Sequence, residues 1–146
     1  MHSFEEQRII ACSASTMYAL VVDIPSYPQF LPWVADARIL ARDRDTITAE
    51  LVAELAGMRY RFSTVDRLLP GQLVEIRLHE GPFRFLESIW SFDAVDDSRC
   101  RVRFSIQFAF RSMMLDVVAA PLFSTACRAM VAAFEQRALQ LQASAR

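Results

Sequence analysis

Residues 86–110 read LESIWSFDAVDDSRCRVRFSIQFAF, and this stretch holds two runs of alternating residues. Residues 86–94 carry mostly apolar side chains at even positions, and residues 102–110 do the same with bulkier ones. A period of two is that of a β-strand with one buried face. Asp96-Asp97-Ser98 separates the runs with residues typical of turns. The stretch therefore predicts an antiparallel hairpin with one large apolar face.

The alternation continues toward the N-terminus, so the hairpin is expected to belong to a longer sheet. Apolar residues take odd positions in 47–55 and mostly even positions in 58–64 and 74–78, and residues 4–12 read as one more strand. Turns are expected where glycine and proline separate these runs, at Gly57, Pro70-Gly71 and Gly81-Pro82. The pattern predicts an antiparallel meander of about six or seven strands.

Two segments have the features of helices. Ser13 and Ser15 offer N-cap hydroxyls to a short helix over Ala14–Val22, which ends before Pro25. From Ser112 to about Leu141, apolar residues recur every three or four positions. The apolar stripe of this long C-terminal helix comprises Phe123, Cys127, Met130, Val131, Phe134, Ala138 and Leu141. Pro121 is expected to kink this helix or to mark a break before its main body.

Together these elements indicate one α+β domain over residues 1–146. The length suits a single domain, and a hydrophobic content of 53% excludes disorder. One helix stripe is available to cover the apolar face of the sheet, so a curved antiparallel sheet wrapped on the C-terminal helix is the expected architecture. The bulky inward rings either fill the core or line a cavity for an apolar ligand, and the pattern alone leaves both interpretations open.

Composition argues against several classes of protein. The formal net charge of −1 gives no overall basic field, so binding to DNA is not expected. The three cysteines, Cys12, Cys100 and Cys127, are odd in number and too widely spaced for a zinc motif, so neither a metal site nor a disulfide framework is expected. The acidic N-terminus is unlike a signal peptide, and the longest apolar run is far shorter than the ~18 residues of a membrane span. We expect a cytoplasmic protein.

Catalytic groups are scarce on the predicted inward face. The two histidines are His2 and His79, and His79 has the outward parity of its strand. Thr64, Ser88 and Tyr60 have the inward parity, but no acid or histidine is expected beside them to activate them. These groups are expected either to be satisfied in the core or to donate hydrogen bonds to a ligand's carbonyl. No catalytic residue and no cofactor is assigned, and the chain is predicted not to be an enzyme, with a cyclase-like enzyme as the less favoured alternative.

Arginines mark the outward face of the hairpin. Arg99, Arg101 and Arg103 share the outward parity, and folding the strands about their turn places Asp93 roughly opposite Arg101. An ordinary cross-strand ion pair is the simpler interpretation. The alternative is a local patch that binds phosphate groups of RNA, which would also include Arg59 and Arg61.

The segment YPQFLPW, residues 27–33, combines two prolines with three aromatic rings. Its simplest role is a hydrophobic plug at one end of the core. A functional role is also open, as a mouth or lid that admits a lipid-like molecule, with Phe30 and Trp33 touching the ligand or a membrane interface. The two roles are compatible.

This segment also carries a resemblance to a known family. Residues 22–24 (VDI) with 27–33 (YPQFLPW), and residues 78–86 (LHEGPFRFL) with 90–92 (WSF), resemble the coenzyme Q-binding protein family. Bacterial members of this family are often called ribosome-association toxins or polyketide cyclase/dehydrase-like proteins. Residues 130–138, MVAAFEQRA, are similar to the family's terminal helix. Ser88 and Val34 depart from the family pattern, which has glycine and often cysteine there, and the serine narrows any cavity at its position.

The resemblance implies a START-like helix-grip fold with a pocket between the sheet and the C-terminal helix. It implies binding of ubiquinone or a similar isoprenoid lipid, in support of respiratory quinone function and without turnover. For some bacterial members it also implies binding of the large ribosomal subunit and a block of subunit joining. Transient membrane contact, peripheral to a bacterial inner membrane, is a further expectation. The resemblance does not choose between quinone and ribosome, because function depends on sites and not on folds.

The candidate ligand-binding residues are bulky apolar side chains from the inward face, the aromatic-proline segment and the C-terminal helix. They are Phe30, Leu31, Trp33, Leu51, Tyr60, Phe62, Ile76, Leu78, Leu86, Trp90, Phe108, Phe110, Val117 and Phe123. A hydrophobic small molecule such as ubiquinone is expected to lie against them.

Overall fold

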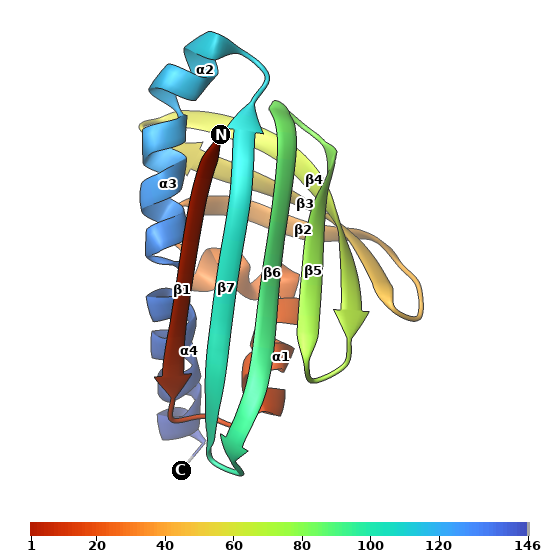
Figure 1. The fold of residues 1–146 in the computed structure, drawn as a ribbon, viewed down its shortest axis with the longest axis vertical. Coiled ribbons are helices and arrows are strands. Elements are labelled where there is room, and N and C mark those ends of the chain that lie inside the picture. Colours follow the sequence, from red (N-terminus) through yellow and green to blue (C-terminus); the bar gives the residue numbers. More distant parts are fainter. Residues whose placement is uncertain (146) are drawn as a thin grey trace.

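The computed structural model describes residues 1–145 as a curved antiparallel sheet with helices on its concave side (Figure 1). The strands are β1 (His2–Ile10), β2 (Val34–Arg42), β3 (Thr46–Leu55), β4 (Met58–Leu69), β5 (Leu73–Glu80), β6 (Phe83–Asp96) and β7 (Arg99–Phe110). The helices are α1 (Ala14–Val22), the 3-10 helix η1 (Ile24–Gln29), α2 (Met113–Val118), α3 (Ala120–Arg128) and α4 (Met130–Ser144). The predicted α+β class and the curved sheet, with seven strands, are confirmed.

The strand order in the sheet is β1-β7-β6-β5-β4-β3-β2, and all neighbouring strands are antiparallel. Strands β2 to β7 therefore form the predicted meander, whereas β1 returns to pair with the last strand. The register places Asp93 opposite Arg101, as the turn between their strands predicts. A register shift between Ser63 and Thr64 in β4 interrupts regular pairing with β5, and such irregularities help a sheet to bend.

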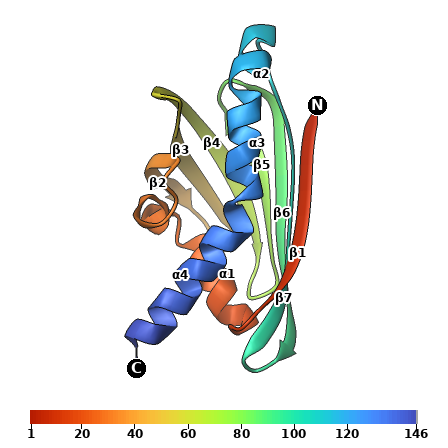
Figure 2. The ribbon, with the colours of Figure 1, turned by 90° about the vertical axis from the view of Figure 1, so that its left-hand side faces the viewer.

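The C-terminal helical region is divided into three helices, with breaks at Ala119 and Ala129. The predicted break near Pro121 is confirmed, because this proline lies in the first turn of α3. Its missing N–H has no partner to lose at that position, so it begins a helix instead of kinking one. The break at Ala129 was not predicted. It lets α4 turn away from α3 along the concave side (Figure 2). Among the described residues, no helix is long and apolar enough to cross a membrane.

Helix α1 spans the predicted residues. Ser13 Oγ caps its N-terminus by accepting the backbone N–H of Thr16 at 3.2 Å. The helix buries Met17 and Val21 and contacts α4 together with β5, β6 and β7. It therefore covers one end of the concave face.

Aromatic rings fill the other end of the concave face. Phe83 stacks on Phe110 with 4.6 Å between ring centroids, and Phe108 meets Phe123 at 4.8 Å. At this end the packed-core interpretation holds, and the empty space lies farther along the sheet.

Gly81 brings the turn between β5 and β6 against the neighbouring strand. A Cβ on Gly81 would lie 2.5 Å from the Cβ of Phe62, and its φ of +151° is one that other residues rarely adopt. Glycine is therefore required at this close approach to β4.

His2 ties the start of β1 to α2. Its Nε2 lies 3.0 Å from Oδ1 of Asp116, and its ring stacks on Phe108 with 5.0 Å between centroids. The same carboxylate oxygen accepts the backbone N–H of Phe110 at 3.2 Å. The hydrogen bonds from Phe110 and His2 lower the pKa of Asp116. These contacts connect the first strand with the turn that follows the last one.

Candidate functional site

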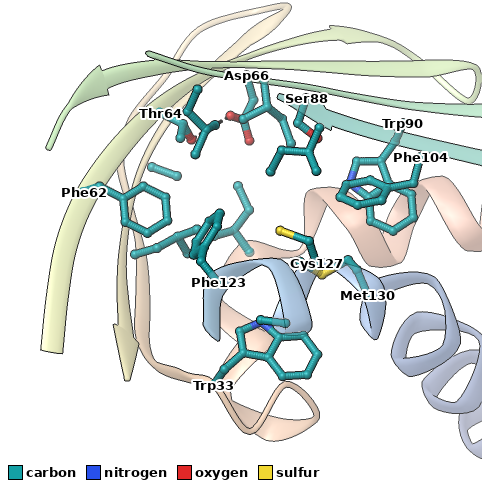
Figure 3. A pocket seen from close by; sticks show the side chains of 17 residues that line it. Trp33, Phe62, Thr64, Asp66, Ser88, Trp90, Phe104, Phe123, Cys127 and Met130 are labelled. Atoms are coloured by element: carbon teal, nitrogen blue, oxygen red, sulfur yellow. Dashed lines mark hydrogen bonds between the residues drawn. The ribbon is translucent and has the colours of Figure 1, made fainter. Parts of the chain in front are cut away.

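A cavity of about 90 Å³ lies between the concave face of the sheet and helix α3 (Figure 3). Strands β3 to β7 supply one wall, while Ile24, Trp33 and the α3 side chains Phe123 and Cys127 lie around the rest. The volume corresponds to about three water molecules and is below the ~150 Å³ of a cavity that binds benzene. A larger ligand therefore requires side chains to move.

Several of the predicted ligand-binding residues meet at this cavity. They are Trp33, Leu51, Phe62, Ile76, Leu86, Trp90 and Phe123. Apolar or sulfur-containing lining residues that the sequence analysis did not assign to the site are Ile24, Ala49, Phe104, Ile106, Ala126, Cys127 and Met130. Phe104 and Ile106 share the even parity of their strand, so the alternation alone contained the signal for these two.

The remaining predicted residues lie outside the lining of this cavity, so their role as ligand contacts stays a prediction. They are Phe30, Leu31, Tyr60, Leu78, Phe108, Phe110 and Val117. Phe108 and Phe110 belong to the packed aromatic end, and Phe30 packs on Phe134 of α4 with 4.9 Å between centroids. Leu31, Tyr60 and Leu78 pack in or against the apolar core. Val117 is 75% exposed, because the break at Ala119 separates α2 from the stripe that α3 buries.

Asp66 is a buried carboxyl at the cavity that the sequence analysis missed. It is 5% exposed, and Oγ1 of Thr64 donates a hydrogen bond to its Oδ1 at 2.8 Å. The expectation that no acid lies beside the inward hydroxyls is therefore wrong. A signal was present, because Asp66 continues the even parity of Phe62 and Thr64 along β4.

Burial governs the ionisation of the groups around the cavity. It raises the pKa of Asp66 from 3.8 to about 6, and the hydrogen bond from Thr64 opposes part of that rise. Burial also raises the pKa of the Cys127 thiol to about 12, so the thiol stays protonated. Among the described residues, Asp66 is the one charged side chain of the lining. Residues 1–145 contain no cluster of three potential metal ligands.

Ser88 and Thr64 are the two inward hydroxyls that the alternation predicts at the cavity. Ser88 is 4% exposed, and its Oγ donates to the backbone carbonyl of Ser105 at 2.8 Å. Both hydroxyls therefore donate their protons within the protein. Tyr60, the third group of that prediction, is half-buried outside the cavity.

Trp33 stands between the cavity and an apolar groove on the surface. The groove has a volume of about 230 Å³ and lies between α3 and the end of β3. Trp33 and Ala126 line both spaces, while Leu55 and Leu122 line the groove alone. The aromatic-proline segment thus packs on α4 through Phe30 and reaches the cavity boundary through Trp33.

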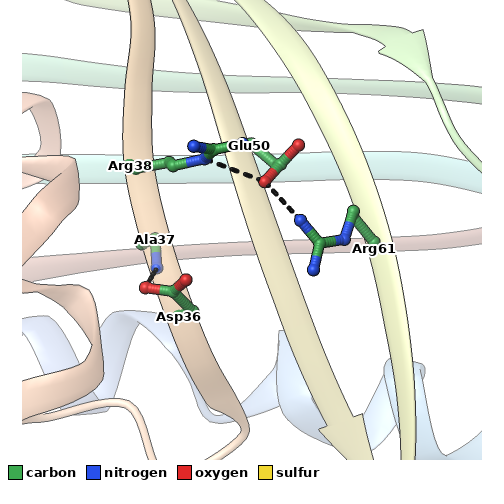
Figure 4. A network of polar contacts seen from close by, with 5 residues as sticks. All are labelled: Asp36, Ala37, Arg38, Glu50 and Arg61. Carbon is green, nitrogen blue, oxygen red and sulfur yellow. Dashed lines mark hydrogen bonds and ion pairs between the residues drawn. The ribbon is translucent and has the colours of Figure 1, made fainter.

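Carboxylates pair with many of the outward arginines. Glu50 on β3 accepts hydrogen bonds from Nε of Arg38 on β2 at 3.0 Å and from Nη1 of Arg61 on β4 at 2.8 Å (Figure 4). These two arginines lower the pKa of Glu50, the bond from Arg38 acting most strongly. Arg59 pairs with Glu54 at 3.2 Å.

The arginines of β7 differ from one another. Arg99 pairs with Asp96 at 2.8 Å. Within the described part of the chain, Arg101 and Arg103 form no ion pair, although Asp93 lies opposite Arg101 in the register. The cross-strand ion pair that was the simpler interpretation is therefore not formed, and the alternative, a phosphate-binding patch, keeps Arg101 and Arg103 as its members outside any ion pair among the described residues.

The chain is similar in sequence to a described family and to named proteins. The family model for polyketide cyclase / dehydrase and lipid transport matches residues 10–135. The ribosome association toxin RatA of Pseudomonas aeruginosa is 32% identical over 137 residues, which cover 94% of this chain and 95% of the toxin. The mitochondrial coenzyme Q-binding protein COQ10 homolog B of Xenopus laevis is 27% identical over 92% of this chain and 57% of that protein.

Solved structures show the same fold. The Zhui aromatase/cyclase from Streptomyces sp. R1128 superposes with a TM-score of 0.85 at 15% identity, over 95% of this chain and 94% of that one. A START superfamily protein from Mycobacterium smegmatis gives a TM-score of 0.82 at 21% identity, over 97% and 99% of the two chains. The helix-grip architecture predicted from the resemblance is therefore confirmed.

Proposed function

The chain belongs to the polyketide cyclase / dehydrase and lipid transport family of START-like proteins, and from this premise we propose that it associates with the ribosome. The observation that carries the proposal is the set of relatives named ribosome association toxin, which are 30–33% identical over 94–97% of this chain. In its specific form, the proposal is that the protein binds the large subunit and blocks subunit joining.

Gradient profiling after overexpression tests this proposal. Extracts of bacteria that overproduce the protein are separated on sucrose gradients, with an empty vector as control. We expect free subunits to rise at the expense of joined ribosomes, and the protein to sediment with the large subunit. An unchanged profile with all of the protein at the top of the gradient contradicts the proposal.

A second function, binding of an apolar molecule without turnover, is supported by the cavity and its groove. Trp33 and Ala126 border both spaces. Once side chains move to enlarge the cavity, a ring in the cavity and an apolar tail in the groove would form one continuous site. Ubiquinone is the specific candidate, because one relative is named for binding coenzyme Q. The names of the relatives, ribosome association toxin and coenzyme Q-binding protein, favour binding over catalysis.

Lipid analysis tests the second function. The purified protein is extracted and the extract is examined by mass spectrometry, and the apoprotein is titrated with a short-chain ubiquinone in a thermal-shift assay. Ala126→Leu would narrow the passage between cavity and groove and should weaken the shift. Ala132→Leu adds the same side chain on the exposed side of α4 and should leave the shift unchanged. A protein without copurified lipid that shows no shift would falsify this function and leave ribosome association standing.

A further inference from the structure

The oxygen atoms of the cavity lie together on its sheet side. Thr64, Asp66 and Ser88 project from β4 and β6 toward the space that Phe123 borders on the helix side (Figure 3). In the register, Asp66 lies opposite Ile76, and Ile76 lies opposite Ser88. Asp66 and Ser88 are therefore two strand spacings apart, about 10 Å along the sheet. The sheet curves inward, so both side chains aim into one small volume.

The hydroxyl protons of Thr64 and Ser88 both form hydrogen bonds within the protein. Thr64 donates to Asp66 at 2.8 Å, and Ser88 donates to the carbonyl of Ser105 at 2.8 Å. A hydroxyl has one proton, so each retains only lone pairs for a ligand. An ionised carboxylate is also an acceptor only and has room for about four hydrogen bonds. Among the described residues, Thr64 is the one side chain that donates to Asp66.

The donors of the lining lie elsewhere. The indole of Trp90 lies beside Phe104 at the end of the cavity opposite Thr64, and the indole of Trp33 lies on the helix side (Figure 3). The Cys127 thiol is a weak donor and projects from α3. A ligand group placed at Asp66 and Thr64 therefore meets hydrogen-bond acceptors.

From this arrangement we propose that the cavity binds an apolar molecule through a hydroxyl group, a phenol or hydroquinone, that donates a hydrogen bond to Asp66. A carbonyl or ether oxygen at the same place would face acceptors and lose the hydrogen bonds it makes in water. The inference rests on the ligand-binding function proposed above and names the chemistry of its ligand. Applied to quinones, it assigns the cavity to the reduced form.

A neutral donor suits the site better than a cation. The rest of the lining is apolar, and an ammonium group would have to give up its hydration to reach Asp66. Two titratable groups bear on the site: Cys127 in the lining, and Tyr27 outside it, whose hydroxyl donates to the carbonyl of Val21 and whose pKa the charge of Asp66 helps to raise. Burial keeps the pKa of both above the neutral range, so neither adds charge at neutral pH. The aromatic lining could still attract a cation, and the experiment includes one for that reason.

Four probes of similar size separate these chemistries. 4-Ethylphenol donates a hydrogen bond, its isomer 4-methylanisole does not, 4-methylbenzaldehyde presents a carbonyl, and 4-methylbenzylammonium presents a cation. Each is titrated into the full chain at pH 7.5 by calorimetry or by NMR. We expect 4-ethylphenol to bind about tenfold more tightly than the anisole or the aldehyde, because only it satisfies the carboxylate.

Variants of Asp66 test whether this residue causes the preference for the phenol. In Asp66→Leu the acceptor is gone, and we expect 4-ethylphenol and 4-methylanisole to bind equally. In Asp66→Asn the amide supplies a donor, and binding of the aldehyde should improve relative to the parent chain. Asp93→Asn removes an exposed carboxyl from the outward face of β6 and should change nothing. If Asp66→Leu does not fold, Asp66→Asn still tests whether the carboxylate sets the ligand preference.

The outcomes distinguish the inference from the function on which it rests. Equal binding of the phenol and the anisole to the parent chain overturns the inference but keeps ligand binding. Tighter binding of the aldehyde overturns it in favour of carbonyl recognition, and tighter binding of the ammonium does so in favour of a cation site. If no probe binds, both the inference and the proposal of an apolar ligand fall.

Discussion

Asp66 makes the stability of the protein depend on pH. Its folded-state pKa of about 6 lies above the ordinary 3.8, so between these values the folded chain holds a proton that the unfolded chain has released. Stability from this group is fully present below about pH 4 and is lost as the pH rises through 6. The loss amounts to about 3 kcal/mol for a shift of roughly two units.

Asp66→Asn should remove this dependence. We expect the free energy of unfolding of the variant, relative to the parent chain, to rise by about 3 kcal/mol between pH 4 and pH 8, whatever the constant cost of the amide. Urea unfolding at a series of pH values measures it. Asp93→Asn provides the matched control, since its carboxyl is exposed. Parallel curves for Asp66→Asn and the parent chain would show that folding leaves the pKa of the Asp66 carboxyl unchanged.

Gly81 and Gly71 allow a comparison of two glycines with positive φ. Alanine at Gly71, with φ +74°, meets no atom within 4 Å, so Gly71→Ala should cost only backbone strain, about 1 kcal/mol. Alanine at Gly81 adds a 2.5 Å approach to the Cβ of Phe62, so Gly81→Ala should cost about 2–4 kcal/mol. The denaturant midpoints of the two variants measure these losses of stability. Equal costs would mean that β4 moves aside freely.

Strand β7 carries the two arginines that we expect ribosomal RNA to contact. The double variant Arg101→Gln with Arg103→Gln should weaken sedimentation with the large subunit several-fold at low salt and flatten its salt dependence, because two phosphate contacts are lost. The double variant Arg59→Gln with Arg61→Gln makes the same change of charge on β4, where both arginines are paired with glutamates, and should have a smaller effect. Equal effects of the two variants would indicate attraction by overall charge and no specific patch.

Most helices and strands were predictable, because apolar residues recur with a different period in each kind of element. Alternation located β3 to β7, and Ser13 with Pro25 bounded α1. The break at Ala129 was not predictable, because alanine favours helix and only the bend of the concave face separates α3 from α4. The tertiary shape of the sheet overrides local preference there.

The cavity was less predictable than the strands that line it. Parity places Phe62, Phe108 and Asp66 on the same face, but it does not say where along the face the rings meet and where they leave space. The aromatic cluster around Phe83 fills one end, and Phe108 and Phe110 belong to this cluster and not to the cavity lining. Asp66 was overlooked because a carboxylate interrupts the apolar pattern at the point where it lines the cavity.

The sheet of the whole molecule is completed by one pairing between distant parts of the chain, that of β1 with β7. The register of β1 with β7 joins His2 to Phe108, whereas β2 to β7 pair with their neighbours in sequence. Loop-closure entropy makes such a pairing slow to form. Pulse-labelled hydrogen exchange during refolding should therefore find the amides of β1 protected after those of β3 and β4. Protection of β1 together with β3 would contradict this order.

The same pairing has a consequence during protein synthesis. About 100 residues separate His2 from its partner Phe108, and at roughly 5–20 residues per second the first strand waits about 5–20 s for the last one to be made. Throughout that time its backbone is an open edge available to chaperones or to other chains. A nascent chain that stalls before β7 is complete would expose both the unpaired first strand and the uncovered concave face, and we expect such fragments to aggregate or to be degraded.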